Sequence, residues 1–315
     1  MRGARALLEW YEPRRRSFPW RGAAPYAVLV SEVMLQQTQA TRVLRAYGQF
    51  LARFPTVDDL AAASPAAAIR TWDGLGYNRR AVALHRAARA IVERHGGRVP
   101  DSVEALRALP GVGPYTAAAV ACFAHGVQLP VVETNVRRVL ARAALGVEPR
   151  EVPPRDLEAI AASSLPSGRA VDWNQALMDL GREVCRLRPR CPECALAPGC
   201  AYRRAGRTPA GAPNGGRVWG GSSPRGESVS TTSGERTPQG KRQPRFEGSS
   251  RPARGRIVAL LRDRGTLSLQ GAAGEAGLTT ARAAVVVAGL ARDGLVRAGP
   301  GAMRGHPRGR IGFPR

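Results

Sequence analysis

The sequence predicts an all-α protein followed by a smaller helical module, and three observations support this fold class. Apolar residues recur at helical spacing over most of residues 6–204, as in the run Ala40, Val43, Leu44, Tyr47, Leu51 and Phe54. No segment of that region shows the alternation of apolar and polar residues expected of a half-buried strand. A glycine-containing hairpin joins two of the helical segments near residues 109–115.

Composition indicates a polyanionic partner. At 315 residues the chain is long enough for a large core and a second unit. Its net charge is +24, and basic residues outnumber acidic ones in every region, so nucleic acid is the simplest partner. A genomic bias that writes arginine for lysine explains why Lys241 is the sole lysine, but it does not explain the shortage of acidic residues.

No stretch of the sequence has the length and apolar character of a membrane span, and residues 1–16 lack the apolar core of a signal peptide. We therefore expect a cytoplasmic protein of bacterial type, monomeric, that associates with the nucleoid through DNA.

The core is expected to span residues 1–204 as a nearly continuous series of helices. Asp101 and Glu104 have the spacing of a capping box at the start of one of them. The predicted helical segments lie near 40–54, 58–70, 79–94, 102–109, 115–124, 136–145, 155–164 and 173–184.

Two further units follow the core. Residues 205–252 are rich in Gly, Ser, Pro, Thr and Arg, which predicts a disordered basic linker. Residues 253–315 then read as a helix, a short helix and a longer helix. A turn at Asp293-Gly294 leads into a possible strand, so we expect a small winged-helix-like module.

Glu32 is an acidic residue inside the apolar run from Ala27 to Leu35. Burial raises the pKa of a carboxyl group, so that it stays protonated near neutral pH, as a general acid must. A buried structural glutamate would give the same pattern. Gln36 and Gln37 follow, with side chains suited to bonding base edges, although a solvated turn would look the same.

Gly111 and Gly113 separate two short helical segments in the stretch LPGVGPYTAAAV, 109–120. Glycine permits a sharp turn and a close approach of the backbone. The backbone amides at the start of the second helix then face outward and can hold a phosphate. The stretch predicts a helix-hairpin-helix.

Glu133 directly precedes a predicted helix in VVETNVRRVLAR, 131–142, for which Thr134 or Asn135 is the expected N-cap. The positive end of that helix should keep the carboxylate ionised. Glu32 and Glu133 then favour opposite protonation states, as an acid and a stabilising carboxylate would. A glutamate that only caps the helix is the competing interpretation.

Four of the five cysteines, Cys185, Cys191, Cys194 and Cys200, lie in the stretch CRLRPRCPECALAPGC. In a cytosolic protein, such clusters bind metal or act in catalysis more often than they form disulfides. Zinc and an iron–sulfur cluster both accept four thiolates. Cys122 lies in an apolar helix and is expected to be a buried core residue.

These stretches together resemble one family, the MutY adenine DNA glycosylases within the helix-hairpin-helix endonuclease III superfamily. The resemblance is continuous over about residues 6–204, and SEVMLQQTQ is its most specific motif. The matching stretches are, in order, LLEWYEPRRRSFPWR, PYAVLVSEVMLQQTQATRV, RFPTVDDLA, WDGLGYNRRAVALHRAA, LPGVGPYTAAAV, NVRRVLAR and WNQALMDLG.

The resemblance implies a cofactor, a substrate and site residues. It implies a [4Fe–4S] cluster on the four clustered cysteines, and a substrate of double-stranded DNA with adenine mispaired with 8-oxoguanine or guanine. It makes Glu32 the acid that protonates a flipped adenine. It also assigns support of the catalytic site to Tyr115 and Asn135, and contact with the opposite base to Gln37, Leu75 and Tyr77. Tyr115 stands where strand-cleaving relatives carry a lysine, so a monofunctional enzyme is expected.

Three departures from the family pattern keep two other functions open. Glu133 stands where the family has an aspartate, and the gap from Cys185 to Cys191 is one residue shorter. The usual β domain for 8-oxoguanine is replaced by the linker, with a reach of roughly 35–40 Å, and the module. A thymine/uracil mismatch glycosylase and a catalytically inactive iron–sulfur DNA-binding regulator are the alternatives.

Overall fold

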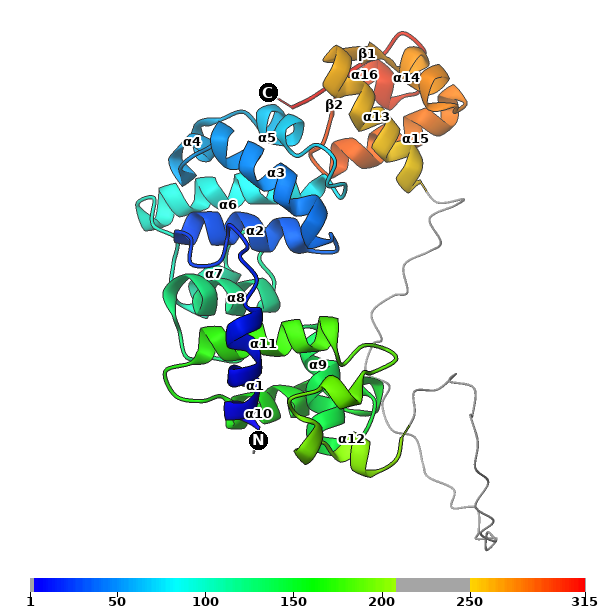
Figure 1. The fold of residues 1–315 in the computed structure, drawn as a ribbon. Coiled ribbons are helices and arrows are strands. Elements are labelled where there is room, and N and C mark those ends of the chain that lie inside the picture. The colour runs from blue at the N-terminus through cyan, green and yellow to red at the C-terminus, as the bar shows by residue number, and fades with distance from the viewer. Residues whose placement is uncertain (1–2, 208–249, 315) are drawn as a thin grey trace, which may run out of the picture.

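The computed structural model describes residues 3–207 and 250–314. Residues 3–207 form two helical lobes, and residues 250–314 form a compact module that packs on the first lobe (Figure 1). Most of the predicted linker, 208–249, lies outside the described residues. No helix in the described ranges is long and apolar enough to cross a membrane.

The first lobe is a bundle of consecutive helices around an aromatic core. Phe50 and Trp72 are fully buried there and meet edge to face, with their ring centroids 5.8 Å apart. The helices are α2 (Pro25–Leu35), α3 (Ala40–Arg53), α4 (Val57–Ala62), α5 (Pro65–Thr71), α6 (Arg79–His95), α7 (Val103–Arg107) and α8 (Pro114–His125).

The second lobe combines the N-terminal helix with residues 134–204. Helix α1 packs against α11, and the two share a separate core with Trp173 at its centre. The elements are α1 (Ala4–Tyr11), α9 (Thr134–Leu140), which continues as a π turn (Ala141–Leu145), α10 (Pro154–Ser164), α11 (Ala170–Glu183) and α12 (Ala201–Arg204). Single 3₁₀ turns lie at Glu12–Arg14, Pro149–Glu151, Cys191–Glu193 and Ala197–Gly199.

The C-terminal module has the element order of a winged helix. Its helices are α13 (Arg251–Arg264), α14 (Leu269–Ala276), α15 (Thr280–Arg292) and the short α16 (Pro300–Met303). Its strands are β1 (Thr266–Ser268), β2 (Arg297–Ala298) and β3 (Arg310–Gly312), and they form an antiparallel sheet in the order β1-β3-β2. Ile311 of the central strand is paired with Leu267 and Ala298.

The predicted all-α core is confirmed, with two local corrections. The single segment expected near 58–70 is two helices, because Ser64 caps a new helix whose first residue is Pro65. The expected capping box of Asp101 and Glu104 is wrong: Ser102 is the N-cap, and its hydroxyl accepts a hydrogen bond from the Ala105 amide. The strand expected after Asp293-Gly294 is β2.

The hairpin between α7 and α8 depends on Gly111 for its shape. Gly111 has φ +79°, and a Cβ there would lie 2.5 Å from the Cβ of Ala83 on α6. Gly113, at the N-cap of α8, has φ −84° and open space around it. Gly111 is therefore required by the fold, whereas Gly113 keeps the outer surface of the turn unobstructed.

We expect Gly111→Ala to destabilise the protein by roughly 2–4 kcal/mol, because left-handed strain and the clash with the Ala83 side chain add together. Gly113→Ala is the matched control and should cost less than about 1 kcal/mol. Urea unfolding followed by circular dichroism measures both. Equal losses would show that the hairpin does not depend on the Gly111 conformation.

Candidate active site

Glu32 lies where the sequence predicts, in the interior of the first lobe. Helix α2 is apolar all round, and the Glu32 side chain is only 6% exposed. Its Oε2 atom has no hydrogen-bond partner within the described part of the protein. A carboxyl group with an unpartnered oxygen in an apolar core is costly when charged, so the protonated form is favoured.

Tyr115 is the polar side chain that faces Glu32. It comes from the first turn of α8, which packs against α2. Burial raises the pKa of Glu32 to about 7, and hydrogen bonding from the Tyr115 hydroxyl partly opposes that rise. The pKa of Tyr115 is itself raised well above its usual range by burial and by the nearby carboxyl groups of Glu32 and Glu133. Tyr115 thus lies close to both acidic residues.

Glu133 is itself the N-cap of α9, in place of the expected Thr134 or Asn135. Its Oε1 accepts hydrogen bonds from the backbone amides of Asn135 at 2.7 Å and Val136 at 2.9 Å. Its Oε2 accepts from the side-chain amide of Asn135 at 3.1 Å. These hydrogen bonds from the first turn of α9 fix the position of the Glu133 carboxyl group.

Asn135 is fixed on its other side by Arg138, which the sequence analysis did not single out. The Arg138 guanidinium donates to Asn135 Oδ1 at 2.6 Å, to the Gly181 carbonyl at 2.6 Å and to the Cys185 carbonyl at 2.6 Å. A Cβ on Gly181 would lie 2.7 Å from the Cβ of Asn135, so the close packing of α11 on α9 requires glycine there. One arginine therefore joins the start of α9 to the cysteine-rich loop.

The residues expected to contact DNA at the end of α2 differ in their surroundings. The Gln36 side chain donates to Thr116 Oγ1 at 3.1 Å, so it joins α2 to α8. Gln37 is exposed and has φ +56°. Gln37 and Tyr77 are the only non-glycine residues with positive φ in the described ranges, and such strain tends to persist at functional positions.

Leu75 and Tyr77 lie on the loop between α5 and α6, and only one of them is presented to solvent. Tyr77 is 46% exposed, whereas Leu75 is 2% exposed and packs in the core of the first lobe. Leu75 therefore reaches DNA only if this loop moves. The Tyr77 side chain is exposed, so it can be contacted without any movement of this loop.

Arg80 joins the two segments that are expected to contact DNA, and the sequence analysis did not single it out. It is 9% exposed and donates to the carbonyls of Val33, Met34 and Gln36 at 2.6–3.0 Å, and to those of Leu75 and Gly76 at 3.2 Å. Burial lowers its pKa to about 10, so it remains charged at neutral pH. The sequence signal for its burial was the position of Arg80, at which the helical pattern of α6 would place an apolar residue.

The four clustered cysteines line one pocket in the second lobe, with Arg142 at its wall. None of them forms a disulfide, and burial raises the pKa of Cys194 to about 11. Within the described residues, no three His, Cys, Asp or Glu side chains converge closely enough to hold one metal ion. The fifth cysteine, Cys122, is fully buried, as expected.

Arg142 holds the loop that carries these cysteines. Its side chain is fully buried, pairs with Glu148 at 2.9 Å and lies 4.9 Å from the ring centroid of Tyr202. It also donates to the carbonyls of Arg186 at 2.6 Å and Leu187 at 3.3 Å, and approaches Cys185 Sγ at 3.8 Å. The loop is therefore shaped by contacts within the protein.

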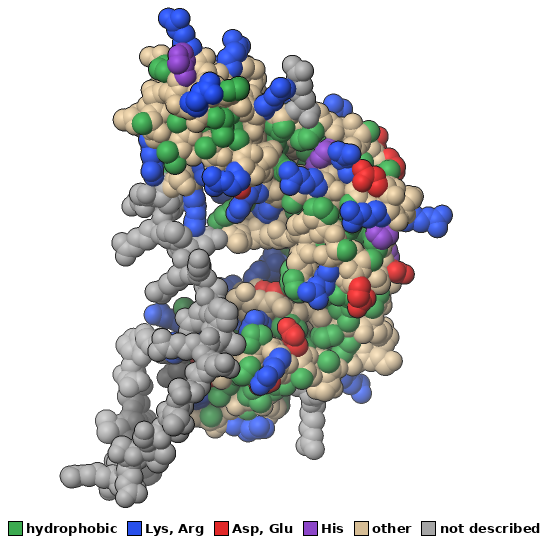
Figure 2. Space-filling model, turned by 180° about the vertical axis from the view of Figure 1, so that it is seen from behind, with side chains coloured by type: hydrophobic (Ala, Val, Ile, Leu, Met, Phe, Trp, Pro, Cys, Tyr) green, Lys and Arg blue, Asp and Glu red, His purple; other side chains and the backbone are tan. Residues whose placement is uncertain are grey.

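The candidate residues lie where the two lobes meet. Glu32, Tyr115 and the hairpin belong to the first lobe, and Glu133 and Asn135 to the second. Figure 2 shows that the molecule is hollowed between the lobes, with basic side chains around the opening. A buried carboxyl group with a raised pKa on one lobe and a second carboxyl group on the other are suited to acid-catalysed bond cleavage, and the basic surface is suited to a polyanion.

Comparisons with known proteins agree with this arrangement. A family model described as "HhH-GPD superfamily base excision DNA repair protein" matches residues 30–161. The adenine DNA glycosylase of Mycolicibacterium smegmatis is 41% identical over 260 residues, which cover 82% of this chain and 79% of that protein. The adenine DNA glycosylase of Mycobacterium tuberculosis is 48% identical over 212 residues, which cover 66% and 69%. A solved thermostable thymine-DNA glycosylase matches with a TM-score of 0.60 and 32% identity, over 64% of this chain and 95% of that one.

The helix-hairpin-helix fold and the family match place the chain among the base excision DNA repair proteins of the HhH-GPD superfamily. Within that superfamily both of these mycobacterial relatives are named adenine DNA glycosylases. The chain belongs to the MutY family of adenine DNA glycosylases.

The raised pKa of Glu32 predicts a pH-dependent stability. A carboxyl whose pKa is raised from 4.5 to about 7 on folding contributes stability at low pH, and loses it as the pH rises through 7. Glu32→Gln removes the charge, so at pH 8 it should stabilise the protein by up to about 3 kcal/mol, and at pH 5 by little. Urea unfolding at both pH values measures this.

The control is Glu104→Gln, which removes an exposed glutamate and should have a small effect that does not change with pH. An effect of Glu32→Gln that is equal at pH 5 and pH 8 would contradict the assignment of Glu32 as a protonated acid.

Proposed function

We propose that this protein is a monofunctional glycosylase that removes adenine mispaired with 8-oxoguanine or guanine from double-stranded DNA. It acts as a monomer in the cytoplasm, at the nucleoid. The observation that carries this proposal is the buried Glu32, whose pKa is raised to about 7, facing Tyr115, which also lies close to Glu133. Excision of the base begins base excision repair.

Glu32 is the proton donor in this mechanism. The target adenine leaves the base stack and enters the recess, since its glycosidic bond is inaccessible within a duplex. The Glu32 carboxyl gives its proton to the adenine ring, and the bonding electron pair of the glycosidic bond leaves with the base. A pKa of about 7 keeps a large fraction of Glu32 protonated at neutral pH.

Glu133 stabilises the positive charge that develops on the sugar as the base departs, until water adds to it. The longer side chain of glutamate folds back onto the amides of its own helix, which holds the carboxylate in one place. This capping supports a role for Glu133 in spite of the extra methylene, because a fixed ionised group needs little reorganisation during the reaction.

Cleavage of the DNA strand through a Schiff base is not expected. That chemistry requires an amine nucleophile, and residues 1–204, which contain the hairpin, include no lysine. The position in the hairpin at which strand-cleaving relatives carry lysine is Tyr115, whose raised pKa keeps it neutral.

Duplex contacts are assigned to three segments around the recess. The backbone amides of the hairpin at Gly111 and Gly113 bind a phosphate, and the exposed face of Gly113 leaves room for it. Gln36 and Gln37 at the end of α2 and Tyr77 on the neighbouring loop face the base pair, with Leu75 behind them. Tyr77 supplies an aromatic surface for stacking.

Cys185, Cys191, Cys194 and Cys200 would hold a [4Fe–4S] cluster in the loop beside α9. Four thiolates on one zinc ion must lie within about 4 Å of one another, since Zn–S bonds are about 2.3 Å long. The cysteines line one pocket without such convergence, which fits a cluster whose irons each take a separate thiolate.

We expect single-turnover release of adenine from duplexes that carry A opposite 8-oxoguanine or G. Glu32→Gln should lower the rate by at least about a thousandfold, because the proton donor is lost. Glu133→Gln should lower it by roughly a hundredfold or more, since the cap is kept and the charge is lost, whereas Glu133→Asp should retain activity. Quenching with heat and separately with alkali, with borohydride trapping, distinguishes base release from strand cleavage.

Release of thymine opposite guanine in the same assay would support the second candidate, which the similarity to a thymine-DNA glycosylase favours. Tight binding of the duplexes without release of any base would contradict the enzymatic proposal and support a DNA-binding regulator.

Cysteine substitution tests the cluster directly. Protein purified without oxygen should contain about four iron atoms per chain and the visible absorption of an iron–sulfur protein. Cys191→Ser should lose both, and Cys122→Ser, which changes a buried cysteine away from the pocket, should lose neither. Stoichiometric zinc in the unaltered protein would contradict the cluster.

A further inference from the structure

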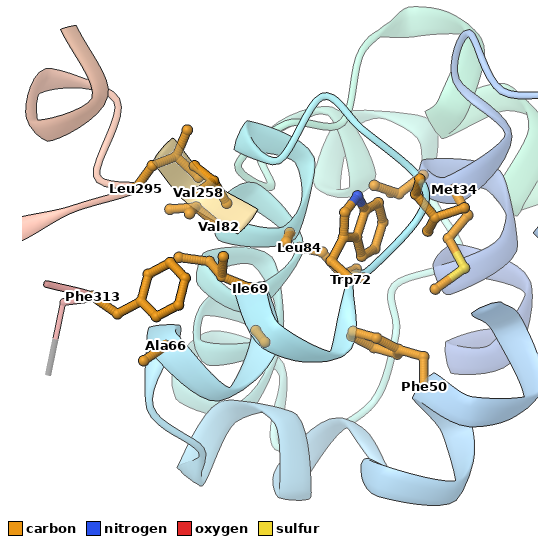
Figure 3. Packing of buried hydrophobic residues seen from close by; sticks show 14 of the residues in the cluster. Met34, Phe50, Ala66, Ile69, Trp72, Val82, Leu84, Val258, Leu295 and Phe313 are labelled. Carbon is orange, nitrogen blue, oxygen red and sulfur yellow. The ribbon is translucent and has the colours of Figure 1, made fainter. Parts of the chain in front are cut away.

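The C-terminal module packs on the first lobe through an apolar contact. Figure 3 shows Val258 and Leu295 of the module beside Val82 of α6, and Phe313 beside Ile69 and Ala66 of α5. All six residues are at most 9% exposed and belong to one continuous buried cluster. The module is therefore docked on the lobe that carries Glu32.

A polar contact at the edge of this interface reaches the loop of Leu75 and Tyr77. Arg262 of α13 pairs with Asp73 through Nη1 and donates through Nη2 to Asn78 Oδ1 at 3.2 Å. Its side chain is only 15% exposed. Asp73 and Asn78 lie at the two ends of the loop, so Arg262 bridges both ends from outside.

The loop needs such support because its backbone is intrinsically free. Gly74 and Gly76 have positive φ angles of +73° and +67°, and Tyr77 follows at +46°. Glycine loses the most conformational freedom on ordering, and a left-handed tyrosine is strained. From the inside, Arg80 and the Trp72 indole hold the carbonyls of residues 75–76.

We propose that the module is a working part of the base-recognition apparatus, and that Arg262 is the positioning residue through which it fixes the loop of residues 73–78. The inference rests on the proposed function, which assigns Tyr77 of this loop to contact with the base pair. The partner presented by the fixed loop is the duplex at the mismatch.

Pre-organisation is the physical gain. A loop already ordered in the free protein does not lose its conformational freedom on binding, so more of the contact energy appears as affinity. The guanidinium fork bridges two acceptors at once, which an ammonium group does less well. Docking also brings the module to a fixed place beside the recess, instead of leaving it as a freely tethered arm.

The test compares Arg262→Gln with Arg264→Gln. Arg264 lies on the same helix, is exposed, and pairs with Glu275 inside the module, so it controls for loss of charge. The first measurement is amide hydrogen exchange of residues 73–78 in the full-length protein without DNA. The second is the dissociation constant for duplexes with A opposite 8-oxoguanine and for fully paired duplexes.

We expect Arg262→Gln to speed exchange in the loop and to weaken binding of the mispaired duplex by roughly five- to tenfold, with little change for paired DNA. The single-turnover rate at saturating enzyme should stay within about twofold, because Glu32 is untouched. If Arg262 had a purely structural role, Arg262→Gln would lower the fraction of active protein and leave the ratio of affinities for mispaired and paired duplexes unchanged.

Arg262→Lys and Asp73→Asn sharpen the result. Lysine should restore part of the discrimination, and Asp73→Asn combined with Arg262→Gln should be less than additive, as expected for residues in contact. Unchanged exchange in Arg262→Gln, or faster exchange with unchanged discrimination, overturns the proposal. Because exchange is measured without DNA, this failure is distinct from a lack of adenine release, which would overturn the proposed function.

Discussion

The functional loops of this protein depend on arginine side chains that satisfy buried carbonyl groups. A carbonyl left without a donor away from water costs about as much as a lost hydrogen bond. Arg80 meets this need at the end of α2, and Arg138 and Arg142 meet it in the cysteine-rich loop. Because the guanidinium has five donors in a rigid fork, one side chain can hold several segments. Because nearly every basic residue of this chain is an arginine, many guanidinium groups are present for such contacts.

The buried acid sets a limit on how stable the protein can be. Glu32 sits in an apolar helix with one unpartnered oxygen, an arrangement that a structural glutamate would avoid. The second lobe presents its carboxylate differently, since Glu133 is surrounded by amide donors. The first lobe therefore contributes a carboxyl group in an apolar environment, and the second lobe contributes one surrounded by hydrogen-bond donors. Burial of the first carboxyl group lowers the stability of the fold but makes the pair suited to acid catalysis.

Sequence reasoning succeeded where the signal is local. The apolar run around Glu32, the Gly111 turn and the cysteine spacing were each sufficient to place the residue and its surroundings. It failed where the partner is distant in sequence: Arg138 and Arg262 look like ordinary basic residues until Cys185 and Asp73 are brought beside them. Helix boundaries failed for a different reason, because Ser102 and Asp101 are equally good caps and tertiary packing decides between them. The two- and three-residue strands are too short for any periodic signal.

The docking of the last module on α5 and α6 also governs the order in which the protein can be completed during synthesis. Ile69 and Val82 are made well before Leu295 and Phe313, the residues that cover them. The pairing of Arg262 with Asp73 spans 189 positions along the chain. Contacts of such long range form slowly, and an uncovered apolar face is prone to aggregation meanwhile. The apolar face of α5 and α6 therefore stays uncovered during synthesis until the module has been made and has docked.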